Sequence, residues 1–224
     1  ALLAPPTRVT LEALIATPRP ADQTLEAWLP EAAAAIGASH PADGEFWGCI
    51  DFRPGLRLVL LRTPTLPPAT HTNCLIVGDG SEVVVIDAAS PYEDEQQRLD
   101  GIIDALAADG RSVRELILTH HHHDHSSGAQ VLADRLGVGI AAHERTRELL
   151  AGKVTVTRTL SDGELIELPA DLPNSRPRRL RVWLTEGHAD GHLVFHEEET
   201  GSVIAGDMVA GIGTILVDPP EGKM

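Results

Sequence analysis

The sequence predicts an α+β protein in which short apolar strands and amphipathic helices follow one another. Residues 113–119 are β-branched and aliphatic, which is typical of a buried strand. Residues 126–136 repeat their apolar side chains at helical spacing. Upstream, Gly78-Asp79-Gly80 is a turn signal in the middle of an expected hairpin over residues 72–87. Together these patterns place a polar turn, between 119 and 126, at the carboxyl end of a strand, where such folds tend to carry their sites.

The first 44 residues differ from the rest of the chain. Residues 9–38 predict one or two helices interrupted by Pro30, followed by an alanine-rich stretch. We therefore expect residues 1–44 to form a helical N-terminal segment of unknown role. Residues 45–224 are expected to form a single domain.

The other elements of that domain follow from turn and cap signals. Arg53-Pro54-Gly55 is a turn signal between two expected strands. A serine near position 126 is expected to cap the helix after the polar turn. In chain order, the expected elements are two strands within 45–62, the hairpin 72–87, a helix over 92–109, the strand 113–119 and the helix 126–136.

Residues 119–125 read Thr-His-His-His-His-Asp-His and hold five of the chain's eleven histidines. Imidazole and carboxylate groups bind zinc and similar divalent cations, and a run this dense is costly to place in an apolar core. A purification tag is the plain alternative. Tags lie at chain ends, whereas this run is internal, contains Asp124 and is framed by a strand and a helix. The sequence therefore predicts a metal site, and we expect two ions.

Composition disfavours nucleic acid and membrane as partners. The formal net charge is −15, with 18 basic residues against 33 acidic ones. No run approaches the roughly 20 apolar residues of a membrane span. Residues 1–6 are too short for a signal peptide and lack a basic flank, so we expect a cytoplasmic location. One basic cluster, Arg176 to Arg181, is expected to begin a strand on a solvated face, with phosphate binding as the alternative.

Four elements follow one another along the chain. They are the strand pair Asn73 to Val77 and Val83 to Asp87, the run Thr119-His120-x-His122-x-Asp124-His125, the turn Thr185-Glu186-Gly187-His188, and the strand Ser202 to Ala205 with Gly206-Asp207. In this order they resemble the metallo-β-lactamase fold superfamily, from about residue 55 to the end of the chain. The last stretch, Ala205 to Thr214, is most similar to the branch of β-lactamase-like protein 2 and related thioesterases.

The resemblance implies an αββα sandwich with the site along one edge of the packed sheets. It implies a catalytic ion held by three nitrogens, with a fourth position open, and a second ion beside it. Zinc is the expected metal, and iron, manganese or cobalt would suit the same ligands. The implied ligands are His120, His122 and His188 for the first ion, Asp124 and His125 for the second, and Asp207 as a carboxylate that bridges the two.

Further roles follow from the same resemblance. Asp124 is expected to orient the attacking hydroxide as well as to bind metal, while His121 and His123 are expected to point away. Asp87 is expected to organise a loop through hydrogen bonds near the site. For His192, a role behind the ligands or against substrate competes with that of an ordinary strand histidine.

The chain departs from the family pattern in three places. Glu186 replaces a proline and Ser127 replaces a glycine, and both changes leave the ligands in place. The third departure is a missing last histidine: relatives supply one to the second ion from a later strand, and here no histidine follows His196. An incomplete copy of the domain, a swapped copy and a one-metal homologue would each explain it. We favour the first, so the second half of the sandwich is expected to be C-terminally truncated.

The expected activity is that of a metallo-hydrolase in which a metal-bound hydroxide attacks a thioester or ester. The expected substrates are small-molecule or carrier-bound acyl groups, on coenzyme A, glutathione or a carrier protein. A metal-dependent endoribonuclease and a catalytically silent binding module are the alternatives. The expected partners are that substrate, a second copy in a homodimer, or the missing C-terminal segment.

Overall fold

The structure is a computed structural model that describes residues 19, 20, 23, 24, 27, 28, 32, 49–210, 215–217 and 222. The expected helical segment 1–44 therefore lies outside the described residues, apart from the few positions before 49. None of the helices in the described ranges is long and apolar enough to cross a bilayer.

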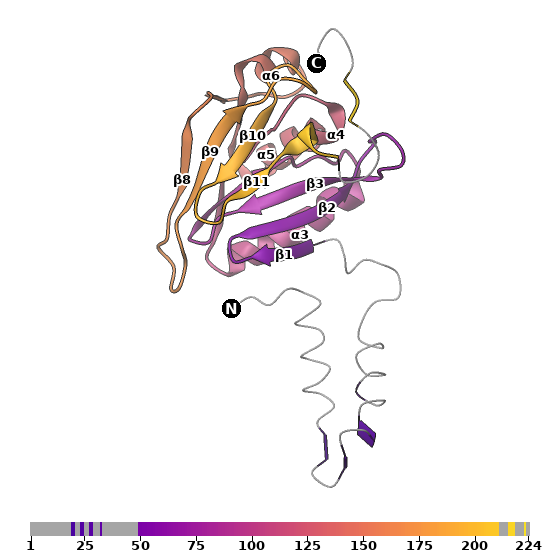
Figure 1. Cartoon of the computed structure of the whole chain (residues 1–224), viewed down its shortest axis with the longest axis vertical. Coiled ribbons are helices and arrows are strands. Elements are labelled where there is room, and N and C mark those ends of the chain that lie inside the picture. The colour runs from indigo at the N-terminus through magenta and orange to yellow at the C-terminus, as the bar shows by residue number, and fades with distance from the viewer. Residues whose placement is uncertain are drawn as a thin grey trace.

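The first sheet has seven strands in the order β1-β2-β3-β4-β5-β6-β7 (Figure 1). Its first four strands pair antiparallel, as the two turn signals predict, and β4 to β7 pair parallel. The strands are β1 (Cys49–Arg53), β2 (Leu56–Arg62), β3 (His71–Val77), β4 (Glu82–Ile86), β5 (Ser112–Ile117), β6 (Gly139–His143) and β7 (Arg158–Leu160).

Helices connect the parallel strands, as right-handed crossovers require. The expected helix over 92–109 is α3 (Glu93–Ala108), and the others are α4 (His123–Ser126), α5 (Ala129–Leu136) and α6 (Glu144–Leu149). The second sheet has the antiparallel order β11-β10-β9-β8. Its strands are β8 (Leu165–Leu168), β9 (Arg178–Leu184), β10 (Leu193–Glu197) and β11 (Ser202–Ile204), followed by the 3-10 turn η2 (Gly206–Met208).

Two apolar cores hold the layers together. Leu116 and Leu118 lie in the core between the first sheet and its helices, while Ile117 lies in the core between the sheets, together with Phe195. This alternation follows from the two-residue period of a strand that is buried on both faces. The predicted sandwich is thus confirmed. Among the described residues, helices pack on the first sheet, and the second helical layer of an αββα arrangement is not among them.

The strand ends bring distant segments to one edge of the sandwich. Asp87 follows β4, and its N–H donates to the carbonyl of Ile117 at the end of β5 (2.9 Å). Leu193, the first residue of β10, donates to the carbonyl of Thr119 (2.8 Å), which ties the second sheet to the end of β5. Figure 1 shows α4 and the end of β11 at the same edge. The polar turn after β5 therefore meets the turns that follow β9 and β11.

The expected serine cap is wrong, and the expected helix 126–136 begins only at Ala129, as α5, after the separate short helix α4 within the histidine run. The hydroxyl of Ser126 donates to the carbonyl of His122 (2.9 Å), and that of Ser127 donates to the carbonyl of His123. A capping side chain would instead accept from an amide. The division falls at Gly128, where an added Cβ would lie 2.4 Å from the carbonyl oxygen of Ala88. Close contact with the β4 loop, rather than capping, determines where α5 begins.

The basic cluster begins β9, as expected, but Arg178 lies on the buried face of this strand rather than on the solvated face. Arg178 is only 5% exposed and pairs with Glu197 (3.4 Å). Arg179 pairs with Glu199 (2.7 Å), and Arg181 pairs with Glu198 (2.6 Å). The sequence could not show this burial, because the partners of Arg178 come from other strands and turns.

Candidate metal centre

Three ring nitrogens converge where the turn after β5 meets the turn after β9. His120 Nε2 lies 3.0 Å from His122 Nδ1, and His188 Nε2 lies 2.8 Å from His122 Nδ1 and 3.3 Å from His120 Nε2. Around a tetrahedral zinc with Zn–N bonds of 2.0–2.1 Å, neighbouring nitrogens are about 3.3 Å apart. The three nitrogens can therefore be donors to one ion, as the sequence predicts.

Hydrogen bonds to neighbouring groups fix which ring nitrogen of His120 and of His188 is available to bind a metal. The hydroxyl of Thr119 donates to Asp87 Oδ2 (2.7 Å), so it accepts from His120 Nδ1 (2.9 Å). His188 Nδ1 donates to the carbonyl oxygen of Leu216 (2.6 Å). In the neutral form of each ring, Nε2 is then the nitrogen without a proton, and it faces the point of convergence. Lone pairs that face one another at this distance repel, and a cation placed between them removes the repulsion.

Burial keeps His120 and His122 in the neutral form that binds metal. Desolvation, followed by the charge of His125, holds the pKa of His120 well below its ordinary value. Desolvation, followed by the charge of His188, lowers the pKa of His122 to about 4. Both rings are therefore neutral at pH 7, as metal ligands must be.

A second group of donors consists of His120, His125 and Asp207. Asp207 Oδ1 lies 3.1 Å from His125 Nε2, while its Oδ2 lies 3.6 Å from His188 Nε2. The carboxylate therefore lies between the two groups, which is the place of a bridging ligand. Its side chain is 39% exposed, whereas those of His125 and His188 are 5% exposed.

Two carboxylates determine the charge of His125. Burial alone would lower its pKa, but Asp87 and Asp207 together raise it to about 10. Burial would likewise raise the pKa of Asp207, but the hydrogen bond and charge of His125 lower it. In the absence of metal, a proton on His125 thus provides the positive charge between these carboxylates.

Asp87 lies behind both donor groups, 2% exposed, with its backbone in the left-handed region (φ +56°). Its carboxylate accepts from the N–H of Thr119 (2.8 Å), from the hydroxyl of Thr119 and from His125 Nδ1 (2.8 Å). It therefore orients His125 directly and His120 through Thr119. The sequence marks Thr119 only by its place before the histidines, and nothing in it marks the Leu216 carbonyl.

The remaining candidate residues lie outside both donor groups. Asp124, in the first turn of α4, is half-buried and belongs to neither group. His121 and His123 also lie outside the donor groups of the described residues. His192 is 0% exposed, and burial, followed by the charge of His188, lowers its pKa to about 3.

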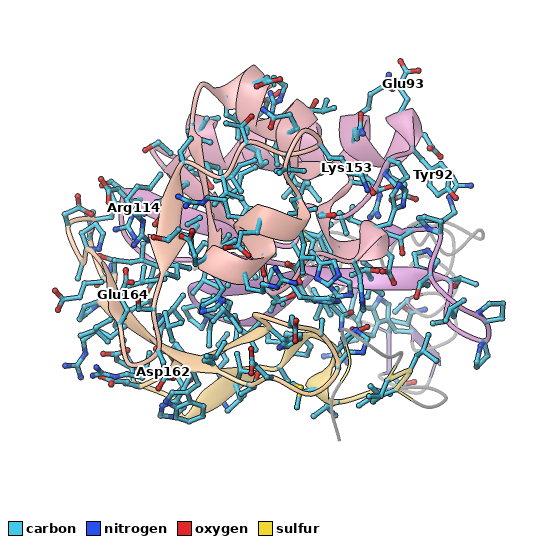
Figure 2. The ribbon with its side chains drawn as sticks, turned by 90° about the horizontal axis from the view of Figure 1, so that it is seen from above. Tyr92, Glu93, Arg114, Lys153, Asp162 and Glu164 are labelled. Carbon is cyan, nitrogen blue, oxygen red and sulfur yellow. The ribbon has the colours of Figure 1, made fainter. Side chains whose placement is uncertain are left out.

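A charged groove of about 390 Å³ opens between the sheets, away from the centre. Figure 2 shows two of its residues, Arg114 and Glu164, on the opposite side of the molecule from Tyr92. Arg158 in this groove pairs with Glu115 (2.8 Å) as well as with Glu164 (2.5 Å). Because its charges pair with one another, the groove is an ion-pair contact between the sheets rather than a rival site.

Known proteins resemble both the sequence and the fold. A family model described as the metallo-beta-lactamase superfamily matches residues 67–224. A metallo-beta-lactamase family protein from Thermus thermophilus superposes with a TM-score of 0.57 at 27% sequence identity, covering 74% of this chain and 63% of that one.

Curated relatives include hydrolases and a thioesterase. A hydroxyacylglutathione hydrolase of Tolumonas auensis is 27% identical, over 72% of this chain and 57% of that protein. A beta-lactamase-like protein 2 homolog of Drosophila melanogaster is 27% identical, over 69% and 52%. An atrochrysone carboxyl ACP thioesterase of Cryptosporiopsis sp. is 28% identical, over 74% and 47%. The chain spans about half the length of these relatives.

Proposed function

We propose that this chain, which belongs to the metallo-beta-lactamase superfamily, is a metal-dependent hydrolase of thioesters or related activated esters. The observation that carries the proposal is the convergence of three imidazole nitrogens beside the half-buried carboxylate of Asp207. The names of the relatives support the substrate class, because they include a hydroxyacylglutathione hydrolase and an acyl-carrier thioesterase.

The residues present fit two divalent ions, with zinc as the proposed metal and iron or manganese as substitutes. His120, His122 and His188 would hold the first ion. His125 and Asp207 would hold the second, with Asp124 as a further candidate ligand. Such ions supply a Lewis acid for the carbonyl oxygen and a water that ionises near neutral pH.

The chain's own residues would prepare this chemistry. Asp87 and Thr119 hold His120 and His125 with their free nitrogens toward the centre. The carbonyl of Leu216 does the same for His188. Asp124, one residue after His123 in the first turn of α4, is proposed to orient the attacking water. Preorganised groups of this kind lower the barrier because they need not rearrange during the reaction.

A thiolate leaving group suits this centre. A free thiol of the cysteine type has a pKa of about 8.5, so it can depart without a strong general acid. Alkoxides and amines are far more basic and depend more on proton donation. We therefore place acyl-glutathione, acyl-coenzyme A and acyl-carrier thioesters ahead of ordinary esters.

The endoribonuclease alternative receives no support from the basic cluster. The guanidinium groups of Arg178, Arg179 and Arg181 pair with Glu197, Glu199 and Glu198. Nucleic-acid binding depends on basic groups that are available to phosphates. Cleavage of RNA but not of thioesters would nevertheless replace the proposal.

The first test uses His122→Ala, with His196→Ala as the control on β10. Removing one of three nitrogens should lower zinc affinity more than tenfold and abolish most release of thiol from a hydroxyacyl glutathione and an acyl-coenzyme A. His196 stacks on Trp183 (centroids 4.9 Å apart), outside both donor groups, so its variant should keep both properties. Metal content by elemental analysis and thiol release by a colorimetric reagent give the two readouts.

The companion variant Asp124→Asn separates chemistry from binding. If Asp124 orients the attacking water, turnover should fall at least tenfold while zinc affinity at the three-nitrogen site changes little. An unchanged turnover in His122→Ala contradicts the ligand set. A wild-type chain that binds zinc but hydrolyses no thioester would instead support the silent binding module.

A further inference from the structure

His192 lies beside the centre and belongs to neither donor group. Its side chain is 0% exposed, and its ring lies against that of His120 with centroids 4.9 Å apart. A buried imidazole must satisfy both of its ring nitrogens or lose stability. The partners of these two nitrogens therefore indicate what the residue does.

The two nitrogens join two different turns. His192 Nε2 accepts from the backbone N–H of Asp207 (3.2 Å). Nδ1 then carries the proton and donates to Thr185 Oγ1 (3.1 Å). The backbone of His192 is anchored as well, because its carbonyl accepts from the N–H of Thr185 (2.9 Å). One imidazole thus links the turn that carries His188 to the turn that carries Asp207.

Gly206 packs directly on this ring. Its backbone has φ +50°, and an added Cβ would lie 2.7 Å from His192 Nε2 and 3.1 Å from the Cβ of Thr119. Only glycine allows the turn to approach so closely. The backbone of η2 therefore packs against His192 and against Thr119, the residue that precedes the histidine run.

The position of the Asp207 carboxylate depends on this contact between Gly206 and the ring of His192. Its Oδ1 faces His125 and its Oδ2 faces His188, at 3.1 and 3.6 Å, although the side chain is 39% exposed. The pairing with His125 holds one oxygen, and the backbone of the turn fixes where the side chain starts and so which way the other oxygen points. We propose that His192 is a positioning residue that holds the Gly206–Asp207 turn and so places the carboxylate between the two donor groups. This rests on the proposed function only in taking Asp207 as a metal ligand.

A matched pair of variants separates the two hydrogen bonds of the ring. His192→Gln places an amide acceptor near the position of Nε2 and can still receive the Asp207 N–H. His192→Asn reaches only as far as Nδ1, so it keeps the Thr185 side and loses Asp207. Titration with Co²⁺, followed by visible absorption, and with Zn²⁺, followed by calorimetry, reports each binding step without any substrate.

His192→Asn should retain the binding step of the three-nitrogen group within about threefold. The step that involves Asp207 should weaken about 10–100-fold, as is typical when a partner behind a ligand is removed. The Co²⁺ absorption spectrum of His192→Asn should differ from that of the wild type, and its kcat for a thioester should fall with little change in KM. His192→Gln should recover most of these losses.

Two results would overturn the proposal. One is a wild-type Co²⁺ spectrum and wild-type affinities in His192→Asn. The other is an equal loss of both binding steps in the Asn and Gln variants together with a lower urea midpoint, which is what simple loss of packing would cause.

Gly206→Ala tests the same contact from the other side and decides the matter if His192→Asn does not fold. It should also weaken the Asp207 step, whereas Gly201→Ala should not. Gly201 has a similar φ of +70°, but an added Cβ there would meet nothing within 4 Å. Equal effects of the two alanines would overturn the proposal. A wild-type chain that hydrolyses no thioester would defeat the proposed function, while the metal titrations would still judge His192.

Discussion

Single side chains at this centre act on more than one ligand. Asp87 orients His125 directly and His120 through the hydroxyl of Thr119, although it belongs to neither donor group. Asp87 also has a left-handed backbone, which costs aspartate less than most residues with a side chain. In this conformation its short carboxylate accepts three hydrogen bonds at once.

The shifted histidines predict a stability maximum for the metal-free protein near pH 6.5. The pKa values of His120, His122 (about 4) and His192 (about 3) are depressed in the folded state, so their contribution is complete above 6.5. It is lost as the pH falls toward 4, because the unfolded chain takes up protons first. The pKa of His125 is raised to about 10, so its contribution is complete below 6.5 and is lost as the pH rises toward 10.

Urea midpoints measured with a chelator from pH 4.5 to 9 check this prediction. The midpoint should fall on both sides of about pH 6.5, and His192→Gln should flatten the acid limb. A midpoint that rises between pH 6.5 and 5 would contradict the assigned shifts.

At the scale of elements, turns and the short helix α4 carry the proposed ligands, and neighbouring elements hold them in place. The turn that carries His188 packs against α6. There the hydroxyl of Thr146 donates to the carbonyl of Gly191 (3.1 Å). An added Cβ at Gly191 would lie 2.7 Å from His143 Nδ1 and 3.1 Å from the N of Thr146. The position of His188 therefore depends on how closely this turn can approach α6.

Gly191→Ala should displace the turn and weaken zinc binding about tenfold, with a loss of about 1–3 kcal/mol in unfolding free energy from overpacking and backbone strain. Gly163→Ala is the matched control. Its φ is +79°, against +73° at Gly191, but an added Cβ would meet nothing within 4 Å. It should cost stability and leave zinc affinity unchanged, as measured by urea unfolding and calorimetry. Equal zinc affinities in the two variants would exclude the proposed packing role.

How far the sequence predicts these features depends on what type of group makes each contact. Candidate donors could be named in advance, because imidazoles and carboxylates at fixed spacing leave a pattern, and His120, His122 and His188 do converge, whereas Asp124 lies in neither donor group. The contact of Leu216 with His188 leaves no pattern, because a backbone carbonyl is the same in every residue. The first five strands and α3 follow from apolar periodicity and turn signals. The division at Gly128 depends instead on a loop that lies far away in the sequence.

At the scale of the whole molecule, buried charge supports the sandwich away from the centre. The guanidinium of Arg178 pairs with Glu197 on β10, lies 4.0 Å from Asp79 in the β3–β4 turn, and donates to the carbonyl of Pro54 in the β1–β2 turn. It thereby connects both sheets. Arg179, the next residue, makes its ion pair with Glu199 at the surface.

Adjacent arginines should therefore differ greatly in their effect on stability. Arg178→Met should lower the free energy of unfolding by about 3–5 kcal/mol, because it leaves the buried carboxylates of Glu197 and Asp79 without a positively charged partner. Arg179→Met should lower it by about 0.2–1 kcal/mol, because water screens an exposed pair. Urea unfolding measures both values, and zinc affinity should be unchanged in each. Similar losses in the two variants would contradict the assigned burial.

The ligands of the three-nitrogen group are far apart in the chain, since His120 and His188 are 68 residues apart and leave from different sheets. A cation bound by both would link these two segments in the folded protein only, because the unfolded chain does not bring the nitrogens together. The folded sandwich would then be stabilised in proportion to the logarithm of free metal concentration, by mass action. In this chain, the supply of metal would control how long the fold persists as well as whether it reacts.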